Sequence, residues 1–364
     1  MNKLRTVESP VGAEVVLDGR RYINFSGSPY LGLSANARLL EEGIAVLRDS
    51  GFGYQLPRHY HFATSAHQEA ELEAATFFDS QAALYLPGGY YFGLVSIAAM
   101  REKISMILFD EWAHYSLREA IAASGLPSHA FRHLDAEDLE AKLKRQVGAG
   151  QPLIVTDGLF STFGEIAPLD ELARVASPYG GRLLVDESHS FGVLGKLGRG
   201  AGEHHNLDTS SIVVGGSTGK AFGVLGGIIP GTSEEVASFR ATPAARGASG
   251  GMPASAAMCA RNLRYVRQHP ELLQRLRTNV KRVKGGLQKL GLDVGDNVVP
   301  IAAFVTTQDK SMAALQERLM LEGIVVLHST YIGASARGVI RCSIFADHSN
   351  EHIDRLIDTL RRLL

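Results

Sequence analysis

The chain has 364 residues, of which 45% are hydrophobic and 21% are charged, and its formal net charge is −1. This composition supplies enough apolar material for a large core, and the balanced charge argues against a nucleic-acid-binding protein, which would carry a basic excess on one face. The two cysteines lie far apart in the sequence, so neither a disulfide framework nor a metal site is expected.

The predicted elements begin with an N-terminal arm over residues 1–35. Ala13–Leu17 and Arg21–Phe25 are short apolar runs typical of strands, and Asp18-Gly19 between them is a hairpin-turn pair. The first residues lack the apolar core of a signal peptide, and no apolar run approaches the length of a membrane span. The sequence therefore predicts a cytoplasmic protein without a membrane span.

Residues 36–255 are predicted to form a large domain in which strands alternate with helices. The predicted strands lie at Ala83–Leu86, Met106–Phe109, Leu153–Val155, Leu183–Val185 and Ile212–Val214. This alternation favours an α/β fold with a mostly parallel sheet that is covered by helices on both faces. In such sheets a ligand binds beyond the carboxyl ends of the strands. The polar residues that follow the predicted strands are Asp110, Asp157, Asp186 and Ser217.

Residues 256–364 have a different pattern and are predicted to form a smaller α+β domain. A charged amphipathic helix is expected over Glu271–Leu290 and a closing helix over Asn350–Leu364. Strands are expected near Val298–Thr306, Ile324–His328 and Val339–Ile344.

Lys220 is the first candidate for chemistry, because it lies between glycines just after a predicted buried strand, in Gly215–Gly223. Lysine is seldom placed there unless it is paired or chemically used, and the glycines make room for a flat group beside the backbone. A phosphate-binding P-loop is excluded because Ala221 follows the lysine. The alternative is an ordinary surface lysine, but the flanking pattern favours a lysine that forms a Schiff base.

Further candidates follow other predicted strands. Asp186 either caps a helix or pairs with the ring nitrogen of pyridoxal 5′-phosphate (PLP), which needs a carboxylate there to act as an electron sink. His189 would then reach the phenolic oxygen of the ring. Gly88-Gly89 opens a predicted helix, an arrangement that binds phosphate. His114 is either a satisfied polar residue or a ring that stacks on the cofactor.

Together these motifs resemble those of the α-oxoamine synthases, which are PLP-dependent enzymes of fold type I. The likeness extends from about Tyr22 to the C-terminus, and its most specific parts are Val185–Gly200 and Gly219–Gly223. The resemblance implies an acyltransferase that condenses an amino acid with an acyl thioester, usually with loss of CO₂. It also implies a homodimer with sites at the subunit interface.

The resemblance assigns a role to each matching residue. Lys220 would hold PLP and move the substrate proton, while Asp186, His189 and His114 would contact its ring. The phosphate contacts would be Gly89, Tyr90, Tyr91 and Ser217, and Asp157, Ser161 and Ser188 would lie near the ring. Arg341 would bind the substrate α-carboxylate through its fork of N–H donors. Ser28 and Arg58 would be further substrate contacts.

Several positions depart from the family pattern. Ser28 stands where the family has a substrate-contacting Asn, and Phe62-Ala63 replaces a common Gly-Thr pair. Ser188 stands beneath the ring where the family usually has Ala, and Gly250-Gly251 lies where the partner subunit normally offers Ser or Thr to the phosphate. These changes leave open the amino acid, the acyl group and whether the donor is acyl-CoA or a carrier protein.

Two other interpretations remain at this point. An aminotransferase, racemase or lyase of fold type I would keep Lys220, Asp186 and Arg341 and differ only in its substrate pocket. A non-catalytic PLP-binding protein is disfavoured, because every position expected near the ring holds a chemically competent residue.

Overall fold

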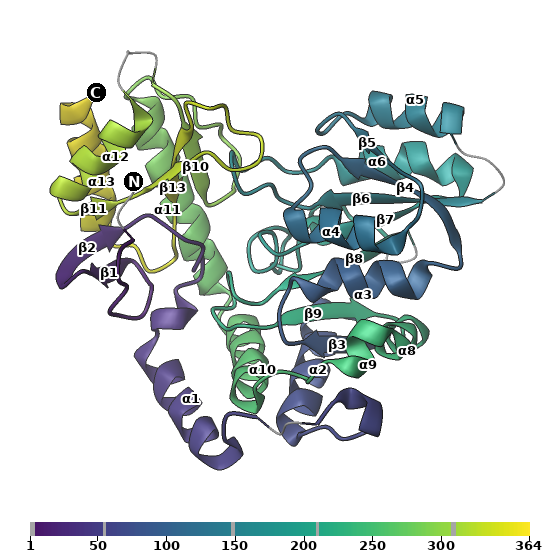
Figure 1. The fold of residues 1–364 in the computed structure, drawn as a ribbon. Coiled ribbons are helices and arrows are strands. Elements are labelled where there is room, and N and C mark those ends of the chain that lie inside the picture. Colours follow the sequence, from purple (N-terminus) through teal and green to yellow (C-terminus); the bar gives the residue numbers. More distant parts are fainter. Residues whose placement is uncertain (1–3, 54–55, 147–149, 209–210, 307–310) are drawn as a thin grey trace.

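The computed structural model describes residues 4–53, 56–146, 150–208, 211–306 and 311–364. At its centre lies a seven-stranded sheet with the strand order β3-β9-β8-β7-β6-β4-β5 (Figure 1). The strands are β3 (Ala82–Leu86), β4 (Ile104–Asp110), β5 (Ser128–Phe131), β6 (Gln151–Asp157), β7 (Arg182–Asp186), β8 (Ile212–Ser217) and β9 (Gly227–Gly231). β5, β4, β6, β7 and β8 are parallel, whereas β9 is antiparallel to both of its neighbours. The predicted α/β class with a mostly parallel sheet is confirmed.

Helices cover both faces of this sheet. One face packs against α3 (Tyr91–Met100), α4 (Tyr115–Ser124), α8 (Ser233–Ala241) and α9 (Pro243–Gly247). The other packs against α2 (Ser65–Phe78), α5 (Ala136–Gln146), α6 (Leu169–Ala176) and α10 (Pro253–Gln268). On β6, Leu153 and Val155 belong to the first core and Ile154 to the second, and all three are buried. Burial on both faces explains why the central strands are continuous apolar runs.

The N-terminal arm forms the expected hairpin. Its strands are β1 (Glu14–Leu17) and β2 (Arg20–Asn24), and the turn residues Asp18 and Gly19 both have positive φ, which matches the twist of a tight hairpin. β2 also pairs in parallel with β11 (Ile324–Val325), so the arm completes a sheet of the C-terminal region (Figure 1). The chain then enters α1 (Ala37–Ser50).

The C-terminal region contains a second, antiparallel sheet with the order β10-β13-β12. Its elements are α11 (Glu271–Gln288), β10 (Ile301–Phe304), α12 (Met312–Leu321), β12 (Leu327–Ser329), β13 (Val339–Ser343) and α13 (Asn350–Leu363). The single strand expected at Ile324–His328 is therefore wrong in one respect: after two residues the chain leaves β11 and joins a different sheet as β12.

The predicted boundary between residues 255 and 256 falls inside α10, which packs against α2 and α1. We therefore propose that the small domain begins with α11.

The remaining elements of the described residues are short: α7 (Ala201–His204) and 3-10 turns at Leu33–Ala35, Arg58–Tyr60 and Ser177–Tyr179.

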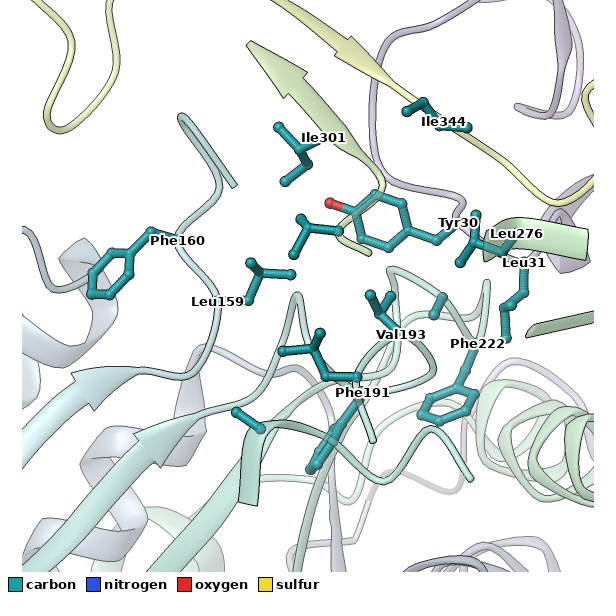
Figure 2. Packing of buried hydrophobic residues seen from close by; sticks show 14 of the residues in the cluster. Tyr30, Leu31, Leu159, Phe160, Phe191, Val193, Phe222, Leu276, Ile301 and Ile344 are labelled. Carbon is teal, nitrogen blue, oxygen red and sulfur yellow. The ribbon is translucent and has the colours of Figure 1, made fainter. Parts of the chain in front are cut away.

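A hydrophobic cluster joins the arm, the large sheet and the small sheet. Tyr30 and Leu31 come from the arm, Phe191 and Phe222 from the large domain and Ile344 from the C-terminal region, and all are buried (Figure 2). This shared core fixes the position of the small sheet relative to the carboxyl ends of the large sheet. Among the residues that the structure describes, no helix combines the length and hydropathy needed to cross a bilayer.

Candidate active site

The polar residues predicted at the strand ends lie together at one edge of the sheet. Asp110, Asp157, Asp186 and Ser217 are the last residues of β4, β6, β7 and β8. Asp157 is in register with Asp186, and Asp186 with Gly215. Both carboxylates are buried, with 8% and 5% of their surfaces exposed. Parallel pairing thus brings acidic groups from distant parts of the sequence side by side.

A cavity of about 180 Å³ lies beyond this edge. Its lining residues come from the predicted strand ends and the loops that follow them: Gly89, Tyr90, His114, Ser116, Asp157, Asp186, Ser188, His189, Ser217 and Lys220. The structure therefore gathers most of the predicted site residues around one space.

Lys220 extends into this cavity, where its Nζ lies 3.2 Å from Nε2 of His189. Burial lowers the pKa of Lys220, the positive charge of Arg341 lowers it further, and Asp186 and Asp157 oppose the shift. A lowered pKa increases the fraction of neutral amine, which is the form that attacks a carbonyl group or accepts a proton.

Close backbone packing forms the floor of the cavity. The Ser188 main-chain N–H donates to Asp186 Oδ1 (2.9 Å), and the Ser217 N–H donates to Ser188 Oγ (2.8 Å). A Cβ atom on Gly89 would lie 2.6 Å from the backbone of Ser217, and one on Gly216 would lie 2.6 Å from the nitrogen of Ser188. Only glycine permits these segments to approach one another so closely.

His114 is held by its own helix start. Its Nδ1 accepts a hydrogen bond from the Ser116 main-chain N–H (3.2 Å) and lies 2.7 Å from the Ser116 hydroxyl. Because a backbone N–H can only donate, the ring proton must lie on Nε2. Burial lowers the pKa of His114 and Lys220 adds to this, while Asp186 and Glu119 oppose it; the net lowering favours the neutral ring, which donates through Nε2.

The main-chain N–H of His114 donates to Asp157 Oδ2 (2.9 Å). Burial, and then the charge of neighbouring Asp186, raises the pKa of Asp157 well above its usual range. Two carboxylates in register in a buried place cannot both be charged without a large energetic cost. Of Asp157 and Asp186, Asp157 is therefore the carboxyl group in which burial and the neighbouring charge favour the protonated form.

Arg341 lies on β13 and is buried, with 6% of its surface exposed. Its Nη2 donates to the Tyr30 hydroxyl (3.3 Å), while its buried Nε has no hydrogen-bond partner among the described residues. A buried guanidinium with an unused donor is suited to bind a carboxylate.

Comparisons with known proteins agree with this geometry. The aminotransferase class I and II family matches residues 20–360. The chain belongs to this family. An 8-amino-7-oxononanoate synthase of Bacillus velezensis is 30% identical over 362 residues, covering 99% of this chain and 92% of the relative. The enzyme of the same name from Methylococcus capsulatus is 34% identical over 361 residues, covering 98% and 92%.

Solved structures point to the same branch of the family. A serine palmitoyltransferase from S. paucimobilis, with a bound PLP–myriocin aldimine, has a TM-score of 0.92 and 25% identity, covering 99% of this chain and 92% of that one. This protein is accordingly an α-oxoamine synthase, a PLP-dependent enzyme of fold type I that condenses an amino acid with an acyl thioester.

The cavity of this α-oxoamine synthase fits PLP. A lysine lies at one side, a buried carboxylate at the strand edge, and beside them a glycine turn in which Gly89 packs directly against the backbone of Ser217. These features match the needs of an imine-forming aldehyde, a pyridine nitrogen and a phosphate group respectively.

Some predicted residues lie outside this cavity. Ser161 lines a smaller neighbouring pocket that shares His114 and Asp157. Tyr91, the first residue of α3, is 38% exposed and does not line the cavity.

Arg58 lies in a different part of the large domain. Its guanidinium donates to Glu71 (3.1 Å) and to the carbonyl of Tyr85 (2.6 Å). It lines a separate pocket of about 550 Å³ together with Phe62 and Ala63. Ser28 lies in the arm, two residues before Tyr30. The roles suggested for these residues stay predictions.

Sequence reasoning missed His133, a histidine beside the site whose side chain is 9% exposed. His133 Nδ1 lies 2.9 Å from Asp110 Oδ1, its Nε2 lies 3.3 Å from Glu165, and Trp112 stacks on its ring at 3.8 Å. Burial opposes protonation of the ring, but the two carboxylates outweigh it and raise the pKa of His133 to about 9. His133, Asp110 and Glu165 are far apart in the sequence, so no local motif predicts that they form a cluster.

The His133 contacts predict a pH-dependent contribution to stability. Since the folded pKa is about 9 and the usual value is 6.5, the stabilisation is complete below about pH 6.5 and is lost as the pH rises through 9. We expect His133→Gln to lower the free energy of unfolding by roughly 2–3 kcal/mol at pH 6. Urea denaturation at several pH values should show the difference from the wild type shrinking towards pH 10.

The exposed His129 on β5 provides a control, because His129→Gln removes a histidine without removing a buried ion pair. A difference between wild type and His133→Gln that is the same at pH 6 and pH 10 would contradict the assignment.

Proposed function

We propose that this enzyme condenses an α-amino acid with an acyl-CoA thioester and releases CO₂ and free CoA. The observation that supports the proposal best is the meeting of Lys220, Asp186 and His114 around one cavity, with the unused N–H donor of Arg341 in the small domain. An amino acid presents a carboxylate and an amine, and these are the groups that an arginine and an imine-forming lysine recognise.

When bound, PLP supplies an electron sink for the bond that is broken at the substrate α-carbon. Asp186, oriented by the Ser188 N–H, would keep a positive charge on the ring nitrogen. Gly89, Tyr90 and Ser217 would hold the phosphate, with Tyr91 at the adjacent start of α3.

Arg341 would hold the substrate carboxylate, and Lys220 Nζ would take the α-proton. Burial and the nearby guanidinium lower the pKa of Lys220, which suits an amine that must accept a proton near neutral pH. The Nε2–H of His114 would donate to the oxygen on which negative charge develops when the thioester carbonyl is attacked. Its neutral state follows from burial and from the fixed hydrogen bond at Nδ1.

The reaction is tested by supplying candidate amino acids with and without a panel of acyl-CoA thioesters. We expect free CoA thiol to be released from the acyl-CoA only when both substrates are present, accompanied by CO₂ in equal amount. Transfer of the amino group to a keto acid without thiol release would indicate an aminotransferase. Loss of optical activity without either product would indicate a racemase.

Lys220→Ala tests the assignment of the lysine. We expect this variant to lose the visible absorption band of lysine-bound PLP and to reduce turnover by about a thousandfold or more, because both imine formation and proton transfer depend on Nζ. The matched control is Lys103→Ala, which removes an exposed lysine outside the cavity and should keep both properties. A wild-type absorption band and rate in Lys220→Ala would overturn the assignment.

We also propose that the chain forms a homodimer. Several apolar side chains of α1 and the segment after it are exposed to solvent: Leu40 at 41%, Ile44 at 43% and Phe52 at 79%. Exposed apolar groups that cluster on one segment are typical of an interface. The carbonyl of Gly250 lies 3.0 Å from Nε2 of His67, in the segment where the family places phosphate contacts between subunits.

Light scattering after size-exclusion chromatography should give a mass twice that of one chain. Ile44→Glu is expected to shift the protein towards the monomer, because a charge would be buried at the interface. Leu321→Glu, at a 75% exposed position of α12, is the matched control and should leave the mass unchanged. A monomeric wild type would show that the proposal is wrong.

A further inference from the structure

A line of buried polar side chains connects the small domain to the lysine. Arg341 Nη2 donates to the Tyr30 hydroxyl (3.3 Å), the Tyr30 hydroxyl lies 2.8 Å from His189 Nδ1, and His189 Nε2 lies 3.2 Å from Lys220 Nζ. These residues come from β13, the N-terminal arm, the loop after β7 and the loop after β8. Tyr30 is completely buried, so water does not compete for its hydroxyl.

The direction of the hydrogen bonds in this line follows from the donor inventory. A guanidinium carries only donors, so the Tyr30 oxygen must accept from Arg341. A phenol has one proton, and the nitrogen of His189 is the acceptor within reach of it. Ser28 is also near the Tyr30 hydroxyl, and its own O–H can rotate to donate to the same oxygen.

His189 is neutral in this setting, so it carries one ring proton and the position of that proton matters. Burial lowers the pKa of His189 well below its usual value, and positive charge on Lys220 or Arg341 acts in the same direction. If Nδ1 accepts the proton of Tyr30, the ring proton must lie on Nε2, and Lys220 Nζ accepts it as the neutral amine, because an ammonium group can only donate. The lowered pKa of Lys220 favours this neutral form.

We infer that Tyr30, oriented by Arg341, is a positioning residue that fixes His189 in the tautomer with its proton on Nε2. The consequence for the reaction rests on the proposed function. An Nε2–H aimed at the cavity donates to the phenolic oxygen of PLP and stabilises negative charge there. The arginine that binds the substrate carboxylate is thus connected through one hydroxyl to the histidine at the cofactor.

The tautomer can be measured without the cofactor, at a pH above the pKa of Lys220, where Nζ is a neutral amine. In the full-length chain labelled with ¹⁵N-histidine, a long-range proton–nitrogen correlation spectrum distinguishes protonated from unprotonated ring nitrogens, and His189→Asn identifies the signal. We expect the wild type to have an unprotonated Nδ1. Tyr30→Phe should give a mixture of tautomers, since Nδ1 then has no fixed donor. Arg341→Gln should do the same, because an amide oxygen can accept the Tyr30 proton and lets the hydrogen bond reverse.

Tyr85→Phe is the matched control. Tyr85 is 1% exposed and its hydroxyl donates to the carbonyl of Leu225 (3.2 Å), so this variant also loses a buried hydroxyl but has no contact with His189. Its His189 signal should match that of the wild type. A wild-type His189 with the proton on Nδ1, or a wild-type tautomer in Tyr30→Phe, would overturn the inference. A change in Tyr30→Phe but not in Arg341→Gln would overturn the part assigned to the arginine.

A second measurement uses the protein with PLP bound. A donor on the phenolic oxygen makes the imine nitrogen hold its proton less tightly, so loss of the fixed tautomer should raise the pKa seen in the visible absorbance titration. We expect a rise of about one unit in Tyr30→Phe and none in Tyr85→Phe. An unchanged pKa in Tyr30→Phe would contradict the role towards the cofactor. If the protein bound no PLP at all, the proposed function would fail while the tautomer measurement still tested Tyr30.

Discussion

The crowding of carboxylates at the carboxyl ends of the parallel strands is the constraint around which the site is arranged. Asp110, Asp157 and Asp186 end neighbouring strands and are all buried. Each is balanced in a different way. Asp110 pairs with His133, whose pKa is raised in return, while the pKa of Asp157 rises because of burial and the charge of Asp186. Asp186, the residue proposed to face the ring nitrogen, instead accepts a hydrogen bond from the main-chain N–H of Ser188.

The two histidines of the cavity, His114 and His189, are both held as neutral rings with a defined tautomer. Each is neutral because burial disfavours the imidazolium, and each has its Nδ1 occupied by a fixed partner: the Ser116 N–H for His114 and the Tyr30 hydroxyl for His189. Both rings then present an Nε2–H to the cavity. An acidic edge that is faced by neutral donors and one lysine can stabilise negative charge on a ligand without itself carrying a large excess of positive charge.

Much of this arrangement could be predicted from the sequence because it depends on local patterns. The strands have the composition of doubly buried strands, and their polar last residues identified the edge where Asp186 and Lys220 meet. What could not be predicted depends on contacts between distant segments. Tyr30 was not among the predicted site residues, and its partners His189 and Arg341 are remote from it in the sequence. The split of β11 from β12 also depends on pairing with the arm, which no local pattern encodes.

Apart from Ser188, which lines the cavity where the family usually has Ala, the departures from the family pattern lie away from the strand ends, and this separation has a physical basis. Ser28 is in the arm, Phe62 and Ala63 line the pocket beside Arg58, and Gly250 is in the segment before α10. The residues of the cavity are held by the sheet register and by close backbone approaches, such as that of Gly89 to Ser217. A substitution there disturbs several strands at once, whereas loop residues can change with little cost to the fold. The residues proposed to carry the chemistry therefore lie in the part of the molecule that the sheet fixes, and most of the departures lie in segments outside it.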